Sequence, residues 1–106
     1  MIILENRFIL KDKLLKLKNE IEKADEVKED TFDFNCLSLW NIFQNYMLNI
    51  LQEFPIYQGK NIIQENIEIF DFLKIDEFNV TAKGDFDKQK EQIFNYINSL
   101  LIELKM

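Results

Sequence analysis

The sequence predicts an all-α fold, a compact four-helix bundle with an irregular segment near residues 75–84. Three observations predict it. The chain has 106 residues, of which 47% are hydrophobic, so residues 1–106 suit a single globular domain with a sizeable core. Two glycines and one proline leave few natural breaks, which favours long regular elements. Apolar residues also recur at intervals of three and four along much of the chain, the spacing of one helix face.

The first helix is predicted from about residue 6 to residue 29, with Asn6 as a suitable N-cap. Phe8 and Leu15 lie about opposite its main apolar stripe at 100° per residue, which predicts a second apolar contact. A homodimer through Phe8 and Leu15 is one form that this contact would take. The main stripe consists of Ile3, Leu10, Leu14, Leu17, Ile21 and Ala24.

The second helix is predicted to begin with Asn35 or Ser38 as its N-cap and to run to Phe54, because Pro55 prevents continuation. Apolar residues cover most of its circumference, which predicts the central and most buried helix. They are Leu39, Trp40, Phe43, Tyr46, Met47, Ile50, Leu51 and Phe54. A strip of side-chain amides remains, and these amides are either buried and paired or in contact with a partner. The strip consists of Asn41, Asn45, Asn49 and Gln52.

The third helix is predicted from Asn61 to Lys74, with apolar residues at helical spacing on one side and acids on the other. Residues 67–72 and 78–82 also alternate in polarity, so a short hairpin and an α+β fold are the alternative. A last helix is predicted to begin after Asp85, which is a good N-cap, and to end at about Lys105.

The residue types exclude most common enzyme mechanisms. There is no histidine to act as a general base or metal ligand, and the glycines fall in no phosphate-binding pattern. Cys36 lies between apolar or aromatic residues in an acidic region that would raise its pKa, which predicts a core thiol. We therefore expect no catalytic residue, no cofactor and no metal. A single cysteine and the lack of an export signal or membrane span predict a cytoplasmic protein.

Charge is the most informative feature of the composition. The net charge is −6, which argues against direct binding to nucleic acid and favours a basic protein as partner. Residues 19–36 hold two basic and seven acidic side chains, and residues 65–87 hold the same numbers. Each block therefore has a net charge of −5.

Each acidic block contains phenylalanines that are suited to anchor a partner. We expect one partner-binding patch on the third helix and one in the linker before the second helix. The first patch consists of Glu65, Glu68, Asp71 and Phe72. The second consists of Glu29, Asp30, Phe32 and Asp33, with Phe34 beside it. For the first patch the alternative is that another element buries Phe72, or that the local structure is a strand. For the second, the alternative is that the rings of the linker are turned into the core.

The acids also have a catalytic interpretation. Glu26-x-x-Glu29 and Glu65-x-x-Glu68-x-x-Asp71 resemble the paired acids with which helical nucleotide pyrophosphohydrolases of the MazG type hold magnesium. The resemblance covers these five residues and implies magnesium-dependent hydrolysis of nucleotides.

Taken together, these patterns predict a non-enzymatic acidic protein that inhibits a basic partner, such as a nuclease toxin or a defence effector. Immunity proteins, antitoxins and phage-encoded inhibitors such as anti-CRISPR proteins act in this way, by occlusion or by mimicry of nucleic acid. The first alternative is a helical accessory subunit or self-associating module. The carboxylate-metal nucleotide hydrolase is the lesser alternative.

Overall fold

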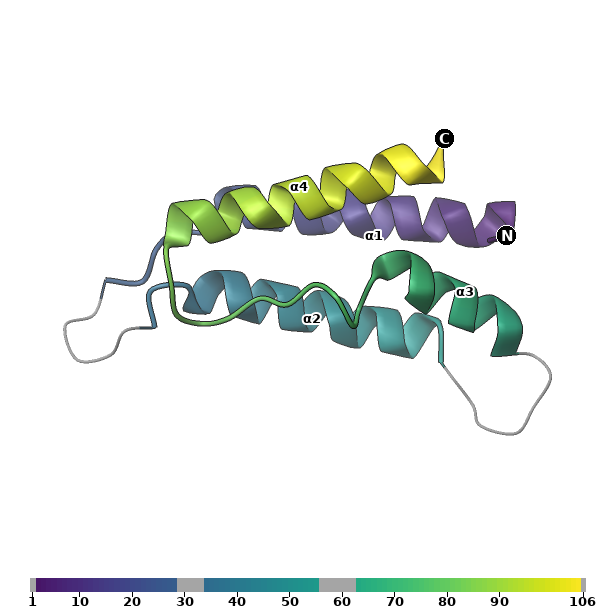
Figure 1. Ribbon diagram of the computed structural model, residues 1–106, viewed down its shortest axis with the longest axis horizontal. Coiled ribbons are helices and arrows are strands. Elements are labelled where there is room, and N and C mark those ends of the chain that lie inside the picture. The colour runs from purple at the N-terminus through teal and green to yellow at the C-terminus, as the bar shows by residue number, and fades with distance from the viewer. Residues whose placement is uncertain (1, 29–33, 56–62, 106) are drawn as a thin grey trace.

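A computed structural model describes residues 2–28, 34–55 and 63–105, and for residues 63–65 it describes the backbone alone. These residues form four helices: α1 (Leu4–Lys23), α2 (Leu37–Glu53), α3 (Ile63–Leu73) and α4 (Phe86–Leu104) (Figure 1). The predicted all-α fold is therefore confirmed. The hairpin alternative is wrong, because residues 67–72 are helical and residues 78–82 are irregular.

The arrangement places α1 between its two main neighbours. Figure 1 shows that α1 runs antiparallel to both α2 and α4, and that the shorter α3 lies near the C-terminal end of α2. The prediction that α2 is the most buried helix is wrong, since Trp40, Leu48 and Leu51 are exposed. Eleven residues of α3 are too few to cover the outer side of α2 along its length.

The end of α1 differs from the prediction because a contact with α4 stops it. The helix ends at Lys23, six residues early, and Ala24 is extended. The Nζ atom of Lys90 donates hydrogen bonds to the carbonyls of Glu22 and Ala24, at 3.0 and 3.1 Å. These bonds satisfy carbonyls that a continuing helix would use.

The predicted N-caps of the first two helices are also wrong. Ile3 precedes α1 and Cys36 precedes α2, and neither makes a side-chain cap. The polar residues near α2 instead join separate segments of the chain. Ser38 Oγ donates to the carbonyl of Asp25 at 2.6 Å, and Asn35 Nδ2 donates to the carbonyl of Gly84. The start of α2 is therefore held by the residues after α1 and before α4.

The start of α4 agrees with the prediction. Asp85 is the N-cap, and its Oδ1 accepts a hydrogen bond from the Lys88 amide at 3.0 Å. Gly84 has a φ of +133°, which side-chain-bearing residues rarely adopt, so a glycine suits the turn into the helix.

The irregular segment between α3 and α4 is anchored by aromatic rings. Phe78 stacks on Tyr96 with ring centroids 4.2 Å apart, and Phe43 of α2 meets both rings edge-on. The Tyr96 hydroxyl donates to the carbonyl of Leu73, at the end of α3, at 2.6 Å. Val80 is buried as well. The segment therefore contributes to the core without regular structure.

Candidate functional site

The exposed acids at the end of α3 form the best-defined candidate surface. Asp71 lies in the last turn of the helix, and Asp76 and Glu77 lie in the turn that follows. All three side chains are exposed, and none forms an ion pair with another described residue. We call Asp71, Asp76 and Glu77 the α3 acidic surface.

Backbone hydrogen bonds keep these acids close together. The Lys74 amide donates to the carbonyl of Asp71 at 3.2 Å, and the Glu77 and Phe78 amides donate to the carbonyl of Lys74 at 3.0 Å. Lys74 adopts a left-handed conformation, with φ of 55°, which ends the helix. The three acids thus stay on one tightly wound segment.

The electrostatics of this surface favour a cation. The C-terminus of a helix carries a partial negative charge, and the last turn of α3 has no basic residue to offset it. The ammonium of Lys74 instead lies 3.6 Å from the Glu103 carboxylate of α4. The helix end and the three carboxylates therefore add their negative potentials.

Phe72 is not the freely exposed anchor that the sequence suggested. Its ring is partly buried and packs against the hydrophobic core, although it lies between the acids in the sequence. Glu68 is also partly buried.

The other predicted partner-binding residues fall outside what the structure describes. This applies to Glu29, Asp30, Phe32 and Asp33, and to the side chain of Glu65, whose backbone belongs to α3.

The acids of the magnesium interpretation are not brought together where the structure describes them. Glu26 follows α1 and accepts a hydrogen bond from Asn35 Nδ2 at 3.4 Å, whereas Glu68 and Asp71 lie on α3, toward the other end of the molecule (Figure 1). Within residues 2–28, 34–55 and 66–105, no three potential metal ligands of the His, Cys, Asp or Glu type form a cluster.

Cys36 is a core thiol, as predicted. Its side chain is fully buried, and Sγ donates to the carbonyl of Gly84 at 3.7 Å. Burial raises the pKa of the Cys36 thiol above its usual range, and the negative charges of Glu26 and Asp85 raise it further. The thiolate needed for nucleophilic chemistry is therefore disfavoured.

A second candidate surface is apolar and runs along the outer side of α1. Leu4, Phe8 and Leu15 are 62%, 58% and 46% exposed, and Ile102 on the neighbouring α4 is 75% exposed. We call Leu4, Phe8 and Leu15, which share one side of α1, the α1 apolar stripe. A row of exposed apolar side chains on one helix face is typical of surfaces that contact another protein.

Sequence reasoning missed Asp76, Glu77 and Ile102 as surface residues. The first two were counted in the acidic block of residues 65–87, but the patch was drawn by helix periodicity and stopped at Phe72. Ile102 falls almost opposite the buried positions of α4 at 100° per residue, a signal that could have identified it.

Comparison of the chain with protein-family models, curated proteins and solved structures gave no match. Among the described residues, no helix combines the length and apolarity needed to cross a membrane.

Proposed function

We propose that this protein is a non-enzymatic binding protein that inhibits a basic partner through the α3 acidic surface. The observation that carries the proposal is the group of three exposed carboxylates, without ion pairs to other described residues, at the negative end of a helix. Acids placed there lower the stability of the helix, so their presence is better explained by a cationic partner than by folding.

The mechanism is occlusion of a cationic surface. A basic partner such as a cytoplasmic nuclease toxin or defence effector binds phosphates with lysine and arginine, and carboxylates spaced along a turn occupy the same positions. Long-range attraction accelerates association, and the partly buried Phe72, which follows Asp71 in the chain, adds apolar contact. Inhibition then results from exclusion of the nucleic acid.

Affinity capture with two matched variants tests this proposal. Asp71→Asn with Glu77→Gln neutralises the surface, and Asp87→Asn with Glu91→Gln removes the same charge from exposed positions on α4. We expect the first variant to slow association with the captured partner by about tenfold at low salt. The second is expected to change the rate by less than about twofold.

The same capture experiment tests whether the carboxylates take the place of nucleic acid phosphates on the partner. Capture should weaken steeply as salt is raised, and duplex DNA should compete for the partner. Retention of every partner at the original rate by the α3 variant would refute the proposal.

A second candidate function is self-association, favoured by the exposure of the α1 apolar stripe. Two copies that pair along this stripe would cover Phe8 and Leu15 in an isologous contact. Because the contact is apolar, the dimer should persist at high salt.

Light scattering on the purified protein tests this second candidate function by measuring the mass of the particle. A mass near twice 12.8 kDa, reduced to the monomer mass by Phe8→Glu, is the expected result. Leu48→Glu serves as the control, because Leu48 is 56% exposed but lies on α2. A monomer at all concentrations excludes the self-associating module.

A further inference from the structure

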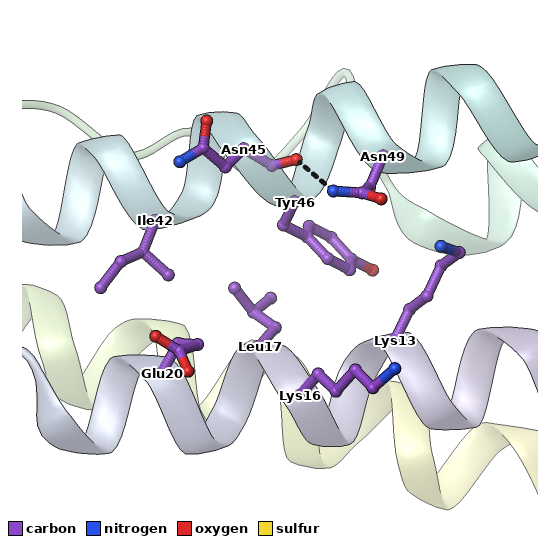
Figure 2. A pocket seen from close by; sticks show the side chains of 8 residues that line it. All are labelled: Lys13, Lys16, Leu17, Glu20, Ile42, Asn45, Tyr46 and Asn49. Carbon is purple, nitrogen blue, oxygen red and sulfur yellow. Dashed lines mark hydrogen bonds between the residues drawn. The ribbon is translucent and has the colours of Figure 1, made fainter.

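A cleft between α1 and α2 has the features of a small-molecule site. Its volume is about 340 Å³, and eight side chains from the two helices line it (Figure 2). Small-molecule sites commonly measure about 300–1,000 Å³ and combine an apolar surface with a few polar groups. The cleft lies on a different part of the molecule from the α3 acidic surface.

The hydroxyl of Tyr46 is the first feature that points to a ligand. The side chain is 7% exposed, and its oxygen is buried without a hydrogen-bond partner among the described residues. In Figure 2 the ring lies along the cleft with its hydroxyl directed toward the side of Lys13. Burial raises the pKa of Tyr46 far above its usual value, so the group stays a neutral donor. A buried hydroxyl without a partner is unfavourable, and an acceptor that enters the cleft and displaces the side chains covering this oxygen would satisfy it.

Lys13 supplies a positive charge at the same end of the cleft. Its side chain is half-buried and forms no ion pair with a described residue, whereas Lys16, one turn along the rim, lies 3.0 Å from Asp12. An ammonium next to a hydroxyl donor is an arrangement that binds carboxylate or phosphate oxygens.

The amide strip of α2 also contributes to the cleft. Asn45 and Asn49 line its wall, and Asn49 Nδ2 donates to the carbonyl of Asn45 at 3.2 Å (Figure 2). This bond fixes the Asn49 side chain on its own helix and leaves its carbonyl oxygen available as an acceptor. The amides thus offer polar contacts without charge.

The remaining side chains of the cleft form an apolar middle and an acidic end. Leu17 is buried and Ile42 is half-buried, and in Figure 2 Glu20 lies beside Ile42, away from Lys13. The Glu20 carboxylate disfavours a second anionic group at that end. The lining therefore suits a ligand with one anionic end and an apolar body.

We propose that this cleft binds a small organic anion, a carboxylate or phosphate monoester with a compact apolar body. Its oxygens accept from the Tyr46 hydroxyl and the Lys13 ammonium, and its body lies over Leu17 and Ile42. This site goes beyond the proposed inhibitory function and does not depend on it.

Titration with benzoate, phenyl phosphate and benzamide tests the site, with binding followed by NMR shifts of the Asn45 and Asn49 side-chain amides. We expect saturable shifts with Kd of about 1 mM for the two anions, the affinity typical of ligands of this size. Benzamide has the shape of benzoate without its charge, and its affinity should be at least about tenfold lower.

Amino-acid substitutions test which side chains bind the anion. Lys13→Gln should weaken benzoate binding about tenfold, and Tyr46→Phe by several-fold. Lys11→Gln is the matched control, because Lys11 is also half-buried on α1 but does not line the cleft, and it should leave Kd within about twofold. Equal binding of benzoate and benzamide, equal effects of the two lysine variants, or no saturable shift with any probe would overturn the proposal.

Discussion

At the scale of single residues, two buried tyrosines make opposite contributions to stability. The Tyr96 hydroxyl donates to the Leu73 carbonyl, whereas the Tyr46 hydroxyl has no partner among the described residues. We predict that Tyr96→Phe lowers the free energy of unfolding by about 1–3 kcal/mol, because a buried carbonyl loses its donor. Tyr46→Phe should leave it unchanged or raise it by up to about 1 kcal/mol.

Denaturant unfolding of both variants measures this difference. The two substitutions remove the same oxygen atom, so each serves as the control for the other. Equal destabilisation by both would mean that the Tyr46 hydroxyl has a partner after all.

Cys36 gives a second prediction at this scale. Because the pKa of its thiol is raised in the folded chain, the thiolate is scarcer in the folded than in the unfolded chain at any pH near 8. A thiol reagent should therefore modify the native protein only as fast as the chain opens, and rapidly once it is unfolded. The folded state holds the thiol proton more tightly than the unfolded chain does. The protonated thiol therefore favours the folded state below a pH of about 8.5, and the free energy of unfolding declines as the pH rises further. Fast labelling of the native protein at pH 7 would contradict this.

At the scale of elements, the cap of α4 is a testable local determinant. Asp85→Ala removes the acceptor for the Lys88 amide and should lower the free energy of unfolding by about 1 kcal/mol. Asp85→Asn keeps a capping oxygen and should retain most of that stability. A similar loss in both variants, measured by denaturant unfolding, would show that charge and not capping is responsible.

Helix existence was predictable from sequence because apolar periodicity reports which face of a helix is buried. Leu10, Leu14, Leu17 and Ile21 were expected on one stripe of α1 and are all buried. The ends were harder to predict, because they depend on contacts between distant segments. The residues after Lys23 are compatible with a helix, and hydrogen bonds from Lys90 and Ser38 to their carbonyls hold them outside it.

The centrality of α2 was mispredicted for a related reason. An apolar circumference shows how much surface a helix would bury, but not how many neighbours the chain provides. Leu48 and Leu51 belong to that circumference and remain exposed.

The candidate sites were predictable only where they depend on composition. Charge counting located the acidic block that contains Asp71, whereas the partial burial of Phe72 depends on the path of the chain around it. The cleft could not be anticipated, because spacing along one helix encodes neither the lack of a partner for Tyr46 among the described residues nor its position near Lys13.

At the scale of the whole molecule, uneven and mostly unpaired charge should make stability depend on salt. The net charge is −6, and the two ion pairs seen between described residues, Lys16 with Asp12 and Lys74 with Glu103, are exposed and contribute little. The molecule measures 51 × 30 × 19 Å, so its charges lie on a slender body within a few Debye lengths of each other.

We therefore predict that raising sodium chloride from low to physiological concentration increases the melting temperature by a few degrees, since screening reduces the repulsion among acids. Thermal unfolding followed by circular dichroism measures the shift. A melting temperature that falls with salt would show that attractive pairs outweigh the net repulsion.

The pairing of α1 with α4 also determines when the protein can fold in a cell. Sixty-two residues lie between Lys23 and Phe86, and a ribosome adds roughly 5–20 residues each second. The first helix is therefore outside the exit tunnel for several seconds before its main neighbour has been made. During that interval its leucines and isoleucines face solvent on the nascent chain, where chaperones bind such segments, and the native bundle assembles in one late step.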